Sequence, residues 1–147
     1  MSDRAGDVSQ TELPDGWAWT RIGDICHRVS QVDPASYFAG NFHYIDISSV
    51  EHDGINPEGI KTHRSDQAPS RARQLVDTGD ILFSTVRVYL RKKGIVPGRL
   101  AGSIASTGFT VLRPVTEMVP EYIYYCLEND EFVKRISRAQ RGTSYPA

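Results

Sequence analysis

Residues 81–113, with the sequence ILFSTVRVYLRKKGIVPGRLAGSIASTGFTVLR, decide the fold class of this chain. Ile81 to Arg87 alternates two sets of side chains, which is the pattern of a β-strand. Two further strands are predicted over Gly94 to Pro97 and Ser103 to Arg113, and Gly108 is expected to mark a bulge or a close backbone approach. The stretch therefore predicts the centre of a mostly antiparallel sheet.

The residues before this stretch add strands and two short helices. Phe42 to Val50 is rich in aromatic and β-branched residues and predicts a strand, which a second strand at Gly59 to Thr62 could follow after the Asp53-Gly54 turn. Two further predictions concern helices and the indoles beside the first of them. Apolar residues at helical spacing predict a helix over residues 22–29, with Thr20 as its N-cap. Residues 65–76 predict a second helix, which Pro69 starts. Trp17 and Trp19 are predicted to be core anchors.

The last third of the chain predicts helices. Pro120 opens a helical stretch, and Asn129 or Asp130 could cap a second one. The chain is therefore expected to be α+β, with a twisted, mostly antiparallel sheet or distorted barrel, a short N-terminal helix, and C-terminal helices packed on it. Residues 1–12 are expected to be a disordered leader and residues 13–147 a single domain.

Length and composition exclude several classes of protein. The 147 residues fit one domain, and no apolar run approaches the ~18 residues that span a bilayer. Met1 to Thr11 lacks the apolar stretch of a secretory signal, so a cytoplasmic location is expected. Cys26 and Cys126 are the only cysteines, and their spacing matches no metal or redox motif.

Charge is distributed unevenly along the chain. The net charge is −1, which argues against indiscriminate coating of nucleic acid. Residues 1–60 hold three Lys or Arg against ten Asp or Glu, whereas residues 61–99 hold nine against three. Arginine offers a planar fork of donors that matches phosphates and the guanine edge. The basic block therefore suits a nucleic-acid surface, although an ordinary solvated surface has the same composition.

No catalytic set is visible in the sequence. There is no nucleophile elbow or phosphate-binding loop, and the four histidines (His27, His43, His52 and His63) are scattered. Asp46 and Asp80 lie in or beside predicted strands with no second carboxylate to complete a metal site. We expect no catalysis by this chain alone, no metal site and no cofactor.

Cations, an aromatic and small polar residues follow the predicted strands. Arg87, Tyr89 and Arg91 are two apart, so in an extended segment they face the same side. Such a side could follow a phosphate backbone, or it could be a solvated loop whose tyrosine packs on the sheet. The candidate nucleic-acid contacts before any resemblance is considered are Arg71, Arg73, Gln74, Arg87, Tyr89, Arg91, Lys92, Lys93, Ser106 and Thr107.

Six stretches in series resemble a target recognition domain from the specificity subunit of type I restriction–modification enzymes. They are LPDGWAWTRIGDIC (13–26), YIDISSV (44–50), APSRARQLVDTGDILFSTVRVYLRKKGIV (68–96), IASTGFTVLRP (104–114), EYIYYCL (121–127) and QRGTSYPA (140–147). The resemblance implies an α/β domain with a twisted sheet that binds double-stranded DNA and reads one half of a bipartite target. It also implies two partners, a methyltransferase (modification) subunit and a motor-nuclease (restriction) subunit.

The resemblance also suggests roles for individual side chains. One or two of Arg71, Arg73, Arg87 and Arg91 would contact base edges, and Gln74 would suit adenine. The remaining arginines, together with Lys92, Lys93 and Arg99, would hold phosphates, with Ser106 and Thr107 as uncharged contacts. Thr143, Ser144 and Tyr145 are candidates for backbone contacts, although Gly142 favours a turn that ends the helix.

The chain departs from the family pattern because it has one recognition domain and no spacer helices. We therefore expect a specificity subunit truncated before its spacer helix, or one of half length. Two other hypotheses stay open. The chain could be an interaction module that dimerises or docks on the methyltransferase subunit, or a small metal-dependent nuclease in which Asp46 or Asp80 acts.

Overall fold

The computed structural model describes residues 12–141, and its strands form three sheets. The first sheet has the order β1 (Cys26–His27), β10 (Phe109–Pro114), β7 (Ile81–Ser84) and β8 (Lys93–Ile95). The second has the order β5 (Lys61–Arg64), β2 (Asn41–Ile45), β9 (Ile104–Ser106) and β6 (Ala72–Leu75). The third sheet is a small hairpin of β3 (Val50–Glu51) and β4 (Gly54–Ile55).

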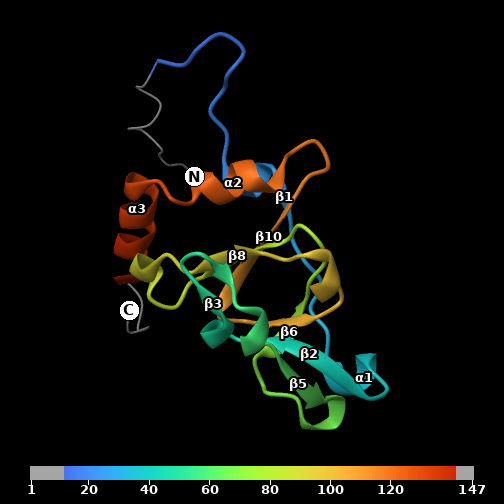
Figure 1. The fold of residues 1–147 in the computed structure, drawn as a ribbon. Coiled ribbons are helices and arrows are strands. Elements are labelled where there is room, and N and C mark those ends of the chain that lie inside the picture. Colours follow the sequence, from blue (N-terminus) through green and yellow to red (C-terminus); the bar gives the residue numbers. More distant parts are fainter. Residues whose placement is uncertain (1–11, 142–147) are drawn as a thin grey trace.

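The expected fold class is confirmed. All strand pairs in residues 12–141 are antiparallel except β2 with β9, and no sheet closes into a barrel. The helices are short α1 (Pro34–Tyr37) and the C-terminal α2 (Pro120–Cys126) and α3 (Asp130–Arg141). Figure 1 shows α2 and α3 at one end of the molecule and α1, β2 and β5 at the other. None of the helices in this described part has the length and apolar character needed to cross a bilayer.

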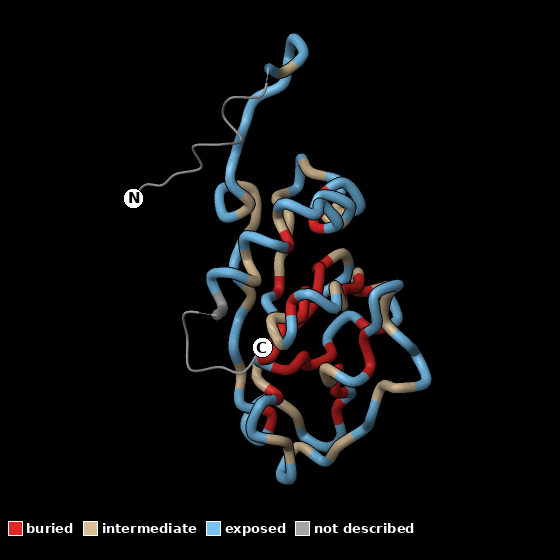
Figure 2. Tube along the Cα trace, turned by 90° about the vertical axis from the view of Figure 1, so that its left-hand side faces the viewer, coloured by how far each residue is buried: buried red, intermediate tan, exposed pale blue. Residues whose placement is uncertain are grey.

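The core has one cluster shared by the two larger sheets and another under the C-terminal helices. Figure 2 shows the buried residues gathered in the interior, away from the exposed N-terminal segment. One cluster joins residues of both sheets, including Ile45, Leu82 and Ala105. A second cluster lies between β7 and the C-terminal helices and includes Ile81, Ile123 and Val133. These clusters hold the strands in place, so the connections at the strand ends have defined positions.

The predicted helix over residues 22–29 is wrong. The structure has a 3-10 turn at Ile22–Asp24 followed by β1, which pairs with β10. Ile22, Ile25 and Cys26 pack on the cluster beneath the C-terminal helices, whereas Val29 packs on the cluster between the sheets. The four apolar residues therefore do not share a helix face, although their spacing matches one. The short N-terminal helix is instead α1, whose cap is Asp33.

Two further expectations are corrected. The predicted helix over residues 65–76 is wrong, since this segment forms a 3-10 turn and then β6. Burial alternates along β6, with Ala72 and Gln74 in the core and Arg73 facing outward, and the strand pairs with β9. Trp17 and Trp19 are not core anchors, since the two indoles are 59% and 50% exposed. The predicted C-terminal helices are confirmed, and the strands predicted over Ile81–Arg87 and Gly94–Pro97 are present as the shorter β7 and β8. The strand predicted over Phe42–Val50 ends at Ile45, before the 3-10 turn Ile47–Ser49, and the one predicted over Gly59–Thr62 is β5, which begins at Lys61 after the 3-10 turn Pro57–Gly59. The Ser103–Arg113 strand is divided by a turn into β9 and β10.

Candidate nucleic-acid interface

Three connections meet at one end of the strands. Arg71 precedes β6, Thr107 links β9 to β10, and Thr85 to Arg87 follows β7. The Thr107 amide donates to the Arg71 carbonyl at 2.9 Å. The Thr85 amide and hydroxyl both donate to the Gly108 carbonyl, at 3.0 and 2.9 Å. These bonds place the three connections side by side, and we call this surface, made of Arg71, Thr85, Arg87 and Thr107, the loop rim.

Gly108 allows this convergence because its backbone approaches Ile47 closely. A Cβ at position 108 would lie 2.7 Å from Cδ1 of Ile47 and 2.9 Å from its Cγ1. We therefore expect Gly108→Ala to lower the free energy of unfolding by about 1 kcal/mol, the low end of the cost of overpacking, because the atoms it meets end a partly exposed side chain that can move. Gly98→Ala is the control, since a Cβ there would meet only the Thr78 hydroxyl, at 3.8 Å. Urea unfolding of both variants measures the difference, and equal stabilities would contradict the close approach.

A cleft adjoins the loop rim on the second sheet. It has a volume of about 360 Å³ and is lined by Tyr44, Asp46, Lys61, His63, Pro69, Ser70 and Arg71. Burial raises the pKa of the Tyr44 hydroxyl, and a hydrogen bond with Ser106 opposes this effect. Asp46 caps the following 3-10 turn, because its carboxylate accepts the Ile47 amide at 2.7 Å. The site thus contains an exposed lysine and an arginine opposite one carboxylate that already has a structural role.

Sequence reasoning missed Lys61 and His63 as members of this site. Tyr44 lies opposite Lys61 in the β2–β5 pairing, and Phe42 lies opposite His63. The antiparallel register therefore brings Lys61 and His63 to the face of the sheet that carries Tyr44. The one signal in the sequence was that Lys61 begins the basic block, which says nothing about where its side chain lies.

The connection after β7 has an unusual backbone. Arg87 and Arg91 adopt left-handed conformations, with φ of 55° and 56°, on either side of the 3-10 turn Val88–Leu90. Left-handed φ values are uncommon for residues with a side chain and persist only where surrounding contacts enforce them. Val88 is buried, whereas Arg87 is exposed and Tyr89 is 55% exposed. The turn therefore presents an arginine and a tyrosine to solvent.

The cations that follow this turn pair with acidic or carbonyl groups of the same protein. Arg91 donates to the Glu128 carbonyl at 2.9 Å and to the Asp130 carboxylate at 2.6 Å. Lys93 is fully buried and pairs with the Glu128 carboxylate. Lys92 lies 3.9 Å from a Glu51 carboxylate oxygen. Lys93 therefore has no surface on which to meet a phosphate, and the Arg91 guanidinium already donates two hydrogen bonds within the protein.

The Arg91–Asp130 contact has a measurable consequence. Hydrogen bonding to the guanidinium, together with its charge, lowers the pKa of the Asp130 carboxyl below its ordinary value. The contact is therefore present at neutral pH and is lost as the pH falls through that lowered pKa. We expect Arg91→Met to raise the Asp130 pKa toward the ordinary aspartate value, as measured by NMR titration. Arg138→Met is the control on α3, and an unchanged Asp130 pKa in Arg91→Met would contradict the contact.

Similar proteins support a family assignment. No family model matches the chain. The chain resembles the HsdS subunit from Thermoanaerobacter tengcongensis, with 37% sequence identity, a TM-score of 0.83, and coverage of 94% of this chain and 36% of that one. The chain is a domain of the type I restriction–modification specificity-subunit family. A second solved structure, described as bearing on complex assembly and conformational transition of the type I R-M system, has the same identity and TM-score over 93% of this chain and 36% of that chain.

A curated relative agrees with this assignment. The type I restriction enzyme HindI specificity subunit of Haemophilus influenzae (strain Rd) is 26% identical over 133 residues, which cover 86% of this chain and 28% of that protein. The chain thus spans about a third of the length of the specificity subunits it matches. The resemblance inferred from the sequence is confirmed.

The structure of this specificity-subunit domain removes two predicted contacts from the surface. Gln74 is buried, and its side-chain amide donates to the Ser106 and Phe109 carbonyls at 2.8 and 2.9 Å. Ser106 is also buried, and its hydroxyl accepts the Gly108 amide at 3.0 Å. Both side chains stabilise the turn that carries Thr107. They shape the loop rim from inside, and their burial keeps them from contact with adenine or phosphate.

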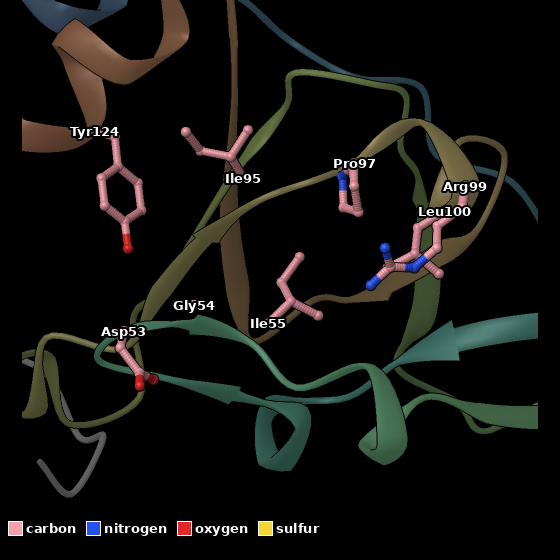
Figure 3. A pocket seen from close by; sticks show the side chains of 8 residues that line it. All are labelled: Asp53, Gly54, Ile55, Ile95, Pro97, Arg99, Leu100 and Tyr124. Carbon is pink, nitrogen blue, oxygen red and sulfur yellow. The ribbon is translucent and has the colours of Figure 1, made fainter.

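Two predicted cations lie apart from the loop rim. Arg73 donates to Asp33 at 3.1 Å, beside α1. Arg99 lies between β8 and β9, at the ends of the strands opposite to Thr107, where the Gly79 amide bonds the Val96 carbonyl. It lines a separate pocket of about 240 Å³, on the side away from Tyr124 (Figure 3). Thr143, Ser144 and Tyr145 lie outside the described residues.

The acids considered for a nuclease have structural roles. Asp80 is buried and accepts two hydrogen bonds from the Arg113 guanidinium, both at 2.8 Å. Asp46 caps a turn, as described above. Between residues 12 and 141, no group of three or more His, Cys, Asp or Glu side chains is placed to hold a metal ion. The geometry therefore offers nothing in favour of that hypothesis.

Proposed function

We propose that this domain binds double-stranded DNA and reads one half of a bipartite target, as a non-catalytic part of a type I specificity subunit. The observation that carries the proposal is the convergence of three separate connections, joined by bonds at Arg71, Thr85 and Thr107, with the exposed Arg87 two residues after Thr85. Exposed arginines beside the exposed Thr107 suit the major-groove edge of a base pair and its flanking phosphates. The similarity to HsdS subunits supports the same function.

Within this proposal the side chains divide into two groups. Arg71 and Arg87 are the base-reading candidates, and Tyr89 and Thr107 contact the sugar–phosphate backbone beside them. Lys61 holds a phosphate at the cleft that adjoins the rim. Arg99, Arg73 and the buried Lys93 are left out, because their positions or partners keep them from this surface.

We propose partners on the basis of the family. The domain works with a methyltransferase subunit and a motor-nuclease subunit of the same system, which carry out the chemistry in the cytoplasm. Wild-type chain incubated with a random-sequence duplex pool should enrich one short motif. Enrichment of no motif, by the chain alone and by its assembly with the methyltransferase subunit, would overturn the proposal.

The Lys61 assignment can be tested separately. We expect Lys61→Gln to weaken binding to the enriched duplex and to a shuffled duplex alike, and to reduce the slope of log K against log salt by about one. The physical reason is that one phosphate contact releases one counterion. Lys134→Gln on α3 is the control for a lost exposed lysine, with an unchanged slope expected. An unchanged slope in Lys61→Gln would contradict the phosphate contact.

A second candidate function is docking on a protein subunit. Exposed aromatics favour it, since Trp17, Trp19, Tyr122 and Tyr125 on the N-terminal segment and α2 are between 49% and 69% exposed. Aromatic side chains are enriched in protein interfaces. Tyr125→Ala should then weaken the association with the methyltransferase subunit in analytical ultracentrifugation without changing affinity for DNA. Equal association of Tyr125→Ala and wild type would argue against this surface.

A further inference from the structure

The corner between α2 and α3 contacts the turn that presents Arg87 and Tyr89. This corner comprises Leu127 to Asp130, and the turn, which we call the arginine turn, comprises Arg87 to Lys92. Val88 in the turn packs in one cluster with Ile123, Leu127 and Val133 of the two helices. The turn and the corner therefore form one packed unit, although nearly 40 residues of sequence separate them.

Arg91 holds the carboxyl side of the arginine turn. Its guanidinium donates to the Glu128 carbonyl at 2.9 Å and to the Asp130 carboxylate at 2.6 Å. The residue sits in the left-handed region, at φ 56°, which a side-chain-bearing residue does not favour without support. The two bonds tie the Arg91 side chain to the corner, and the Arg91 amide donates to the Val88 carbonyl at 2.9 Å within the turn.

Lys93 provides a second attachment from beneath. Its ammonium is fully buried, pairs with the Glu128 carboxylate, and lies 3.4 Å from the Arg91 carbonyl. It also lies 5.2 Å from the centre of the Tyr124 ring, a distance typical of a cation–π contact. A buried ammonium needs all of these partners, so its position is closely defined. Glu128 thus contacts both cations, through its carbonyl and its carboxylate.

We propose that Arg91 and Lys93 are positioning residues, and that the α2–α3 corner uses them to hold the arginine turn in the conformation that presents Arg87 and Tyr89 to DNA. The inference rests on the proposed function for the role of Arg87. The attachment of the turn to the corner does not depend on it. A basic run that resembles a phosphate-binding loop in the sequence is thus divided into cations that face solvent and cations that brace the loop.

Loss of Asp130 should weaken DNA binding, the opposite of what charge repulsion alone predicts. Removing a carboxylate near a DNA-binding surface ordinarily strengthens binding, because it removes repulsion from phosphates. Asp130→Ala instead removes one of the two bonds that hold the Arg91 guanidinium, leaving the bond to the Glu128 carbonyl, and so loosens the turn. We expect its affinity for the duplex enriched by wild type to fall by about two- to tenfold, the size expected for one coupled contact. The salt slope should stay unchanged, because no phosphate contact is lost.

Matched variants isolate the effect. Glu131→Ala removes a carboxylate from the same helical turn, and Glu131 makes no hydrogen bond or ion pair with the arginine turn in the described structure. Asp130→Glu keeps a carboxylate and should restore most of the lost affinity. Hydrogen exchange of the Leu90 and Arg91 amides, which bond within the turn, should accelerate in DNA-free Asp130→Ala and not in Glu131→Ala.

The outcomes separate the two proposals. Faster exchange and weaker binding in Asp130→Ala, with rescue by Asp130→Glu, support the positioning role. Unchanged exchange in Asp130→Ala, or stronger binding with a steeper salt slope, overturns it, since the slope would assign the freed Arg91 to a phosphate. If wild type enriches no duplex while exchange still accelerates, the DNA function fails and the attachment of the turn stands.

Discussion

Asp80→Asn is expected to lower the free energy of unfolding by about 2–4 kcal/mol. Breaking a buried ion pair from one side costs about 3–5 kcal/mol, and the value here is reduced because the Arg113 side chain is 35% exposed. Asp80 accepts both guanidinium bonds and also the Asp77 amide, at 2.8 Å. An amide group cannot accept all of these donors, so the variant turns an amide NH2 group toward at least one of them.

The pair formed by Arg64 and Asp66 provides the control. It has the same two-bond geometry, at 3.1 and 2.7 Å, but both side chains are more than 60% exposed. Asp66→Asn should therefore change stability by less than about 1 kcal/mol. Urea denaturation followed by far-ultraviolet circular dichroism measures both variants, since both tryptophans are exposed. Equal losses in the two would mean that burial of Asp80 does not govern the strength of its pair.

Arg71→Ala and Arg87→Ala are each expected to cost about 1–3 kcal/mol of discrimination for the cognate duplex, and to relax the preference at one base pair. A guanidinium that reads a base edge makes its contact only with the matching base, so its loss affects cognate DNA more than shuffled DNA. Alanine meets the same restriction as arginine at positive φ, so Arg87→Ala leaves the backbone strain of the turn nearly unchanged.

Arg99→Ala is the matched control for these two variants. It removes an exposed arginine from the same basic block, but at the opposite ends of the strands. Its effect on the preference for cognate DNA should be negligible. Binding curves for each variant with the enriched and the shuffled duplex give the ratio directly. A loss of discrimination in Arg99→Ala equal to that in Arg87→Ala would contradict the placement of the interface on the loop rim.

The two wrong helices show where periodicity in the sequence is insufficient. The spacing of Ile22, Ile25, Cys26 and Val29 matches a helix, but pairing with β10 and packing on two different clusters override it. Around Pro69 the helical prediction fails because β6 completes the edge of the second sheet, where burial alternates. Both segments are short, and in short segments tertiary contacts outweigh local propensity.

The strands at 81–84 and 93–95, the C-terminal helices and the family resemblance follow from the sequence alone, and the alternation over residues 81–87 and the helical spacing after Pro120 agree there with the tertiary contacts. The sequence predicted one strand over Ser103 to Arg113, whereas the fold divides it into β9 and β10 in two different sheets. Which cations face solvent is decided only by the tertiary structure. Arg87 and Lys93 are equivalent members of one basic run, yet one is exposed and the other is buried against Glu128, 35 residues away. Charge composition is a local property of the chain, whereas the environment of each charge depends on partners that only folding brings together.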